Sequence, residues 1–284
     1  MQNVHFSTTD LAELFSVNVS TIKRWIDRGM LLSDTTPGGH RRVTQRHLEA
    51  FVENNKRLAE HPYVLRRYVQ KSVDSGIIWR QLYKKLLAND IGACRSLIQD
   101  AFLSKAQLPH LLENVITPAL KHIGSEWAKG RISIYQEHQM SFLVRLLLVE
   151  MNTYIPEPSK HAKKAILACI EGDRHEIPLQ MLGLILKMHS IKPVILGTNI
   201  PVSEIIRACE SAQPQFLLLT RVFSKLRTFN YLQTVARYAS MHNIRMVYGG
   251  QGWSEKEKKS FVDSGAMYDS SLISFDGYLQ KTIV

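Results

Sequence analysis

The chain has 284 residues, of which 45% are hydrophobic, and its formal net charge is +11 at pH 7. This length predicts two or three domains with separate cores, and the positive charge favours an anionic partner such as nucleic acid. No run of about 18 apolar residues occurs, so the sequence predicts no membrane-spanning helix. The first residues lack a basic region followed by an apolar one, which argues against a signal peptide. The cysteines Cys94, Cys169 and Cys209 lie far apart and form no metal-binding spacing, which suits a cytoplasmic protein.

Residues 6–54 have the pattern of a small DNA-binding domain. Residues 7–10 supply N-cap side chains for a short first helix, and Val19–Arg28 is predicted to be a second helix that ends at Gly29. The apolar face of this second helix is expected to turn inward. Its outward face carries the polar and basic side chains expected of a recognition helix in the major groove, namely Ser20, Thr21, Lys23 and Arg24.

A basic hairpin is expected after the recognition helix. Pro37-Gly38-Gly39 predicts a tight turn, and the side chains that follow, His40, Arg41 and Arg42, can reach phosphate groups. The order of helix, turn, helix and Thr-Pro-Gly-Gly-His-Arg-Arg wing resembles the winged helices of the MerR family and of excisionases. This resemblance implies that residues 1–55 bind a double-stranded DNA operator. The alternative is that the basic side chains form only a solvated face.

The middle of the chain has helical periodicity. Residues 56–75 are predicted to be a polar, partly helical linker, and residues 76–160 a helical domain. A four-helix bundle is expected there, with helices at about 76–88, 90–104, 106–128 and 134–153.

Residues 161–284 alternate apolar runs with helical patterns. Such alternation predicts a parallel sheet with helices on both faces, here a flavodoxin-like, Rossmann-type domain. Strands are expected at about 164–170, 193–197, 215–220 and 244–248, with a fifth near 266–268. The chain is therefore predicted to be a multidomain protein of mixed α and α/β class, made of a winged helix-turn-helix, a four-helix bundle and a parallel-sheet domain.

The stretch Gly172-Asp173-Arg174-His175-Glu176-Ile177-Pro178 follows the first of these strands. A histidine at the carboxyl end of a strand lies where open α/β sheets bind ligands. The stretch resembles the cobalamin-binding motif Asp-x-His-x-x-Gly, with Pro178 in place of the final glycine. The resemblance implies that His175 ligates the cobalt of a corrinoid. It also implies that Asp173 bonds the other ring nitrogen, which would fix the tautomer of the imidazole and raise its basicity.

Two further segments match the same family by their spacing. Thr220-Arg221-Val222 is separated from Pro178 by 41 residues and is a conservative version of the family's Ser-x-Leu. Another 26 residues separate Val222 from Gly249-Gly250. The resemblance adds four residues to the expected cofactor site: Thr220, Val222, Gly249 and Gly250. Turns at 197–201 and 249–252 contain glycines that would allow the backbone to approach a nucleotide tail closely. The alternative is a domain that keeps this fold but has lost the cofactor.

A second signature lies in the helical region. Trp127 is separated by nine residues from Glu137-His138, and this resembles the Trp-x9-Glu-His signature of the CarH and LitR transcription factors. The resemblance implies that these side chains surround the adenosyl group of adenosylcobalamin, where an indole can stack on adenine. The alternative places Trp127 in the bundle core and leaves the other two on a solvated helix start. Ala128 stands where the best-known members have a histidine, so this position offers no second ligand to cobalt.

The resemblance to the CarH and LitR type of MerR regulator covers nearly the whole chain. It implies a repressor without enzymatic activity that adenosylcobalamin assembles into a DNA-binding homo-oligomer, expected to be a tetramer. Light would cleave the cobalt–carbon bond and dissolve the oligomer, so that fewer DNA contacts hold the protein on its operator. Two alternatives stay open. One is a regulator of the same build that senses another ligand or a protein partner. The other is a cobalamin methyltransferase module or mutase subunit, against which the winged helix stands.

Overall fold

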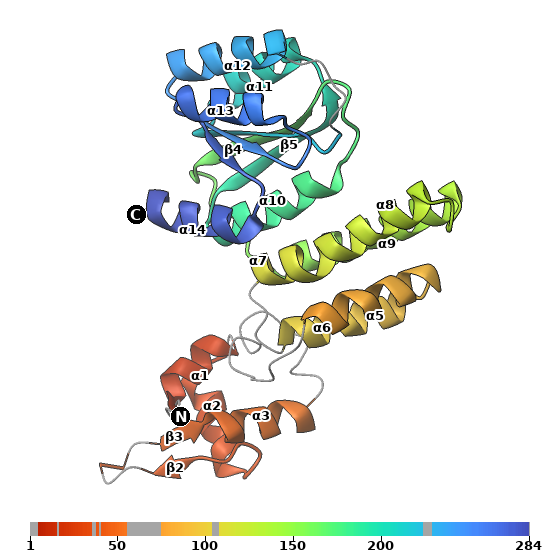
Figure 1. The fold of residues 1–284 in the computed structure, drawn as a ribbon. Coiled ribbons are helices and arrows are strands. Elements are labelled where there is room, and N and C mark those ends of the chain that lie inside the picture. The colour runs from red at the N-terminus through yellow and green to blue at the C-terminus, as the bar shows by residue number, and fades with distance from the viewer. Residues whose placement is uncertain are drawn as a thin grey trace. The chain divides into compact units, whose positions relative to one another are not determined.

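The computed structural model describes residues 5–15, 17–35, 38–39, 41–55, 75–103, 108–223 and 229–283 (Figure 1). The chain divides into two compact units, one made of Met1–Asp74 with Arg95–Gln107 and the other of Ser75–Cys94 with Leu108–Val284. The predicted linker, apart from Ser75, and His40 of the predicted wing lie outside the described residues. Within the described ranges, every helix is too short or too polar to cross a lipid bilayer.

The first unit contains a winged helix. A three-stranded sheet of order β1-β3-β2 is antiparallel throughout, and the pairing of β2 with β3 forms the predicted wing. Two signals read from the sequence are confirmed: Ser7 and Asp10 exchange side-chain to backbone hydrogen bonds at the start of α1, and Gly29 follows α2 with φ +69°. The elements are β1 (His5–Ser7), α1 (Thr8–Leu14), α2 (Val19–Asp27), β2 (Asp34–Thr35), β3 (Arg41–Thr44) and α3 (Gln45–Asn54).

The core of this winged helix is apolar and aromatic. Leu11, Ile22 and Val43 are fully buried, which shows that α1, α2 and β3 share one core. Trp25 packs edge-on against Phe15, with 5.4 Å between the ring centroids. The inward face predicted for α2 is therefore confirmed, and Ser20, Lys23 and Arg24 on its opposite face are exposed.

The predicted helices of the middle region are present. They are α5 (Ser75–Leu87), α6 (Ile91–Leu103), α7 (Leu108–Leu111), the π-helical segment η2 (Leu112–Ile116), α8 (Thr117–Ala128) and α9 (Ile134–Thr153). The third predicted helix is thus a continuous rod in which η2 inserts one wide turn between α7 and α8. In the second unit α5 packs against η2, α8 and α9, whereas residues 95–103 of α6 group with the first unit.

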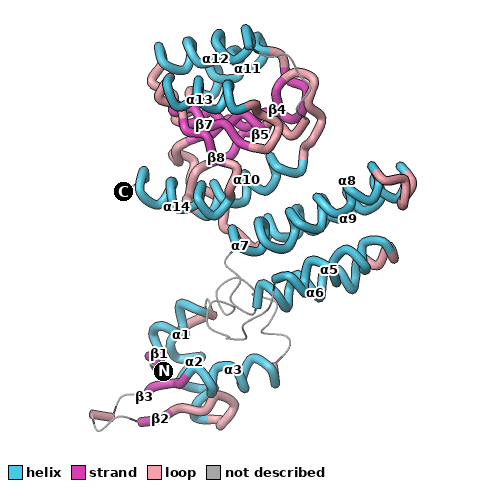
Figure 2. The backbone as a smooth tube through the Cα atoms, viewed as in Figure 1, coloured by secondary structure: helices cyan, strands magenta, loops and turns pink. Residues whose placement is uncertain are grey.

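The C-terminal domain is a five-stranded parallel sheet of order β5-β4-β6-β7-β8, coloured magenta in Figure 2. All five predicted strands are confirmed. The elements are β4 (Lys164–Ile170), α10 (Ile177–Met188), β5 (Lys192–Ile200), α11 (Val202–Ala212), β6 (Phe216–Thr220), α12 (Phe229–Met241), β7 (Arg245–Gly249), α13 (Glu255–Asp263), β8 (Met267–Asp269) and α14 (Leu272–Ile283). This is the flavodoxin-like strand order. The chain adds β5 on one side of β4 and the later strands on the other side, and ligands bind in such folds at this switch point between β4 and β6.

Helices cover both faces of this sheet. One face packs against α11, α12 and α13, while α10 and α14 lie on the other side (Figure 1). Residues 165–170 of β4 are all buried, because a central parallel strand is covered on both faces. The apolar run that identified this strand in the sequence is the direct result of that double coverage.

Candidate functional site

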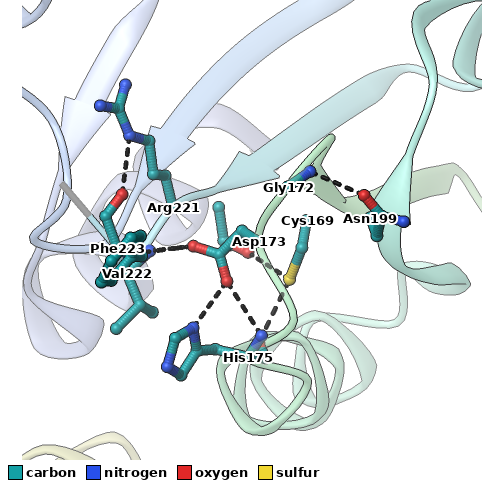
Figure 3. A network of polar contacts seen from close by, with 9 residues as sticks. Cys169, Gly172, Asp173, His175, Asn199, Arg221, Val222 and Phe223 are labelled. Atoms are coloured by element: carbon teal, nitrogen blue, oxygen red, sulfur yellow. Dashed lines mark hydrogen bonds and ion pairs between the residues drawn. The ribbon is translucent and has the colours of Figure 1, made fainter. Parts of the chain in front are cut away.

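Asp173 and His175 lie in the loop between β4 and α10, at the carboxyl edge of the sheet (Figure 3). The His175 Nδ1 is 2.7 Å from Asp173 Oδ1, and the backbone N–H of His175 donates to the same oxygen at 2.9 Å. Half of the imidazole is solvent-exposed, with 52% accessibility, whereas Asp173 is completely buried. Because Nδ1 faces the carboxylate, Nε2 is the ring nitrogen that is left for a metal ion.

The second carboxylate oxygen of Asp173 is held by the loop that follows β6. The backbone N–H groups of Val222 and Phe223 donate to Asp173 Oδ2 at 2.6 and 3.1 Å. Burial acts to raise the pKa of Asp173, but its hydrogen bonds with His175, Val222 and Phe223 lower that pKa overall. The carboxylate is therefore ionised and fully hydrogen-bonded.

The charge of this carboxylate acts on the imidazole. The pKa of His175 is raised, first by its hydrogen bond to Asp173, and burial opposes this change. The negative charges of Asp173 and of Glu137 on α9 also raise it. Glu137 is thus within electrostatic reach of the His175 ring, which brings one residue of the helical signature to the sheet motif.

Two more side chains steady the ligand loop. The Cys169 thiol donates to the backbone carbonyl of His175 at 3.1 Å and lies 3.2 Å from the Thr220 hydroxyl. Burial raises the pKa of this thiol to about 12, so it stays protonated and able to donate. Asn199 at the end of β5 accepts a hydrogen bond from Gly172 N at 2.7 Å through its side chain. Its own N–H donates to the carbonyl of Asp173 at 2.8 Å.

Gly249 and Gly250 lie beside the same loop. A Cβ atom on Gly250 would meet the carbonyl oxygen of Arg221 at 2.3 Å, and one on Gly252 would meet the Arg221 Cγ at 2.8 Å. In this structure these two glycines therefore make room for protein backbone and side chain, whereas the sequence suggested room for a nucleotide tail. Gly249 accepts a hydrogen bond from Arg221 N at 3.1 Å.

Pro178, the departure from the motif, has a local explanation. It occupies the first turn of α10, which begins at Ile177. The N–H groups of a first turn have no partner within the helix, so proline loses nothing there and its fixed φ suits the helix. The substitution is compatible with the geometry of the ligand loop.

The helical signature lies on the surface of α8 and α9. Trp127 is 49% exposed, so the alternative that placed it in the bundle core is wrong. Glu137 accepts a hydrogen bond from the Ser141 hydroxyl at 2.8 Å and lies 3.4 Å from His138 Nδ1. The His138 ring is exposed, and Ala128 is the last residue of α8. Trp127 and His138 are thus exposed to solvent, and the negative charge of Glu137 helps to raise the pKa of His175 in the sheet motif.

The predicted DNA-binding residues have different roles in the winged helix. Ser20, Lys23 and Arg24 are exposed on α2, and Thr21 is partly buried. Arg42 is exposed on β3. Arg41 instead contacts Asp27 at 2.6 Å and the Lys23 carbonyl at 3.4 Å, and so fastens the wing to the recognition helix.

Sequence reasoning missed three residues of the sheet site: Cys169, Asn199 and Arg221. Cys169 and Arg221 lie inside apolar or motif stretches where their own chemistry gave no signal. Asn199 has φ +56°, and an asparagine in a turn after a strand is a recognised sign of left-handed backbone. That signal could have identified it as a loop-positioning residue.

Comparisons with known proteins concern the helical segment, the winged helix and the fold. A family model described as a B12 binding domain matches residues 78–148, the helical segment, and a helix-turn-helix domain model matches residues 6–56. The monomethylamine corrinoid protein of Methanosarcina barkeri has a similar fold, with a TM-score of 0.56 and 13% identity, over 74% of this chain and 100% of that one.

Two curated relatives come from Myxococcus xanthus. The HTH-type transcriptional repressor CarH is 27% identical over 264 residues, which are 84% of this chain and 86% of CarH. The HTH-type transcriptional repressor CarA is 29% identical over 161 residues, which are 56% of this chain and 53% of CarA. The winged helix, the match to a B12 binding domain model and the similarity to both repressors support a transcriptional regulator of the CarH type.

Proposed function

We propose that this protein is a transcriptional repressor that binds operator DNA through residues 1–55 and is controlled by adenosylcobalamin. One observation carries the proposal: a buried aspartate orients a half-exposed histidine at the switch point of a flavodoxin-like sheet, in the same chain as a winged helix. The similarity to two repressors supports the DNA-binding role. Domain limits of 1–55, 56–75, 76–160 and 161–284 are part of the same proposal.

The residues fit a corrinoid better than a free metal ion. Nowhere in the described part of the chain do three or more metal-binding side chains form a group. A corrin ring brings its own equatorial nitrogens, so a single imidazole from the protein is sufficient. His175 would be that ligand, and Asp173 would fix its tautomer and raise its basicity. Thr220, Val222, Gly249 and Gly250 would shape the site below the ring.

The helical segment would cover the opposite side of the cofactor. Trp127 presents an exposed indole that can stack on adenine, and Glu137 and His138 can bond to ribose or to base edges. When bound, adenosylcobalamin supplies a cobalt–carbon bond that light breaks. Loss of the adenosyl group would leave the three side chains without their partner and weaken the hold of the helices on the sheet domain.

We further propose that the cofactor-bound protein is a homo-oligomer, with a tetramer as the expected state. Several winged helices in one assembly bind neighbouring operator segments more tightly than one winged helix does, because later contacts are intramolecular. Light would therefore reduce operator binding by reducing the number of linked DNA-binding domains. In this proposal the protein has no enzymatic activity.

The test is to load the protein with adenosylcobalamin in the dark and record its absorption spectrum and its size by gel filtration. We expect retained corrinoid with the spectrum of an imidazole-ligated cobalt. His175→Ala should lose that spectrum. His242→Ala, which changes an exposed histidine stacked on Tyr238, should keep it. Illumination should shrink the oligomer. A wild-type protein that elutes without corrinoid would favour a regulator that senses another ligand or a partner protein.

A further inference from the structure

Arg221 is a buried cation at the edge of the site. It follows β6 directly, and only 2% of the residue is exposed. Its guanidinium NH1 lies 2.7 Å from Glu257 Oε1, and its Cζ is 5.0 Å from the centroid of the Trp253 ring. A buried charge is costly unless it is paired and hydrogen-bonded. The partners of Arg221 meet that requirement, so its position is specifically built.

We propose that Arg221, paired with Glu257, is a positioning residue for the cobalt ligand, an inference that rests on the proposed cobalamin site. The guanidinium Nε donates to the backbone carbonyl of Phe223 at 3.1 Å. This bond closes the loop over residues 221–223, and the N–H groups of Val222 and Phe223 then point at Asp173 Oδ2. Figure 3 shows the series of contacts that leads from Arg221 through Phe223 and Val222 to Asp173 and then to His175.

The backbone of Arg221 is fixed on both sides as well. Its N–H donates to the carbonyl of Gly249 at 3.1 Å, and its own carbonyl accepts from Gly252 N at 2.9 Å. Trp253 adds a bond from its indole N–H to the same Gly249 carbonyl at 2.7 Å. Main chain and side chain together therefore leave the loop little freedom to turn its N–H groups away from Asp173.

Glu257 anchors the far end of this arrangement. Its other oxygen, Oε2, accepts from the backbone N–H and the hydroxyl of Ser254 at 2.8 and 2.7 Å. Burial acts to raise the pKa of Glu257, but its hydrogen bonds with Ser254 and Arg221 lower it overall. The ion pair is therefore held by the start of α13, and a series of contacts runs from α13 through Arg221 and Asp173 to the imidazole.

The side chain must be arginine to do this. A guanidinium is planar and presents separate N–H donors in fixed directions, so it can bond Phe223 and Glu257 simultaneously. A lysine ammonium at the same position would keep the charge but could not reproduce both directions. Arg221→Lys therefore separates the positioning role from the buried charge.

The experiment compares Arg221→Lys, the double variant Arg221→Met with Glu257→Gln, and the control Arg207→Met. Arg207 forms an exposed ion pair with Glu204 at 3.2 Å on α11 of the same domain. The first readout is hydrogen exchange of the Val222 and Phe223 amides in cofactor-free protein. The second is the share of bound cobalamin that shows an imidazole-ligated spectrum.

We expect both Arg221 variants to exchange these two amides about tenfold faster, as the loss of one hydrogen bond to a charged group implies. Exchange in β4 should stay unchanged, because the core of the sheet is not altered. Corrinoid affinity should fall about 10-fold to 100-fold, the usual effect of changing a group behind a metal ligand. Arg207→Met should behave as wild type in both measurements.

Unchanged amide exchange in folded Arg221→Lys protein would overturn the proposal, and this variant decides the matter if the double variant does not fold. The exchange measurement needs no cofactor. If wild-type protein takes up no cobalamin, the proposed function fails while the role of Arg221 in holding Asp173 is still decided by exchange. Faster exchange with an unchanged cobalt spectrum would show that the loop moves without affecting the ligand, and would also refute the positioning role.

Discussion

Replacing Asp173 with asparagine provides a direct test of the sheet site. The two oxygens of this carboxylate accept four hydrogen bonds: Oδ1 from His175 N and Nδ1, and Oδ2 from Val222 N and Phe223 N. An asparagine amide has one oxygen and one NH2 group. If the NH2 group is turned towards Val222 and Phe223, it faces two N–H donors and two of the four hydrogen bonds are lost. If it is turned towards His175, the bond from the His175 backbone N–H is lost, and Nδ1 keeps a bond only by taking the tautomer in which it accepts.

The cost follows from these lost contacts. A hydrogen bond to a charged group contributes about 1.5–3 kcal/mol, so the loss of one or two of them amounts to roughly 1.5–6 kcal/mol of unfolding free energy. Asp173 has 0% exposure, and solvent cannot replace its partners without rearrangement. Domains are typically stable by about 5–15 kcal/mol, so Asp173→Asn should remove a large part of the stability of this one.

Urea denaturation of cofactor-free protein, followed through the α/β domain, measures this loss. Asp90→Asn is the matched control, because Asp90 is an exposed helix cap that accepts a hydrogen bond from Ala93 N at 2.8 Å at the start of α6. Asparagine caps a helix as well as aspartate does, so this change should be almost neutral. A loss below about 1 kcal/mol for Asp173→Asn would refute the four-bond assignment.

Five further substitutions test other parts of the molecule. Arg42→Ala should weaken operator binding and flatten its salt dependence in a gel-shift series, because a phosphate contact is lost. Arg41→Ala should weaken binding mainly by freeing the wing from Asp27, with less change in the salt slope, and equal slopes for both variants would contradict this division. Gly250→Ala should lower the free energy of unfolding by about 1–3 kcal/mol, since φ at this position is +93° and the new Cβ would meet the carbonyl oxygen of Arg221. Gly277 lies inside α14 with open space around it, so Gly277→Ala should instead raise the free energy of unfolding by about 0.5–1 kcal/mol. If α8 covers the cofactor as proposed, Ala128→His would offer a second nitrogen to cobalt and should give a longer-lived photoproduct. A photoproduct lifetime equal to that of wild type would count against the capping role of α8.

The elements of this protein could be predicted where one physical signal dominates. The strand at 164–170 is buried on both faces, so its apolar run is unbroken and its limits agree with β4. The π-helical turn at Leu112–Ile116 has no comparable signal, because its residues continue an ordinary helical pattern. The segment packs against α5 and is followed, after one residue, by Pro118, which has no N–H to continue the regular α-helical hydrogen bonds.

The site shows the same division between local and distant causes. Asp173 and His175 are two residues apart, so a short motif was sufficient to pair them. Arg221 and Glu257 are paired only because β6 and α13 meet in the folded domain. Arg41 has the composition of a DNA contact, but its pairing with Asp27 depends on how the wing folds back on α2.

The packing of Gly250 against Arg221 has a consequence for how this motif can change. The segments Asp173–His175, Thr220–Val222 and Gly249–Gly250 contact one another in sequence order, so they form one connected unit and not three separate contributions. Substitutions in them should be strongly non-additive, since each acts on the same loop. A side chain at position 250 would meet the backbone of residue 221, which no substitution at position 221 removes, so it would be tolerated only if the path of the 221–223 loop changed. A change at Gly250 is therefore expected to disturb the hydrogen bonds that Val222 and Phe223 donate to Asp173.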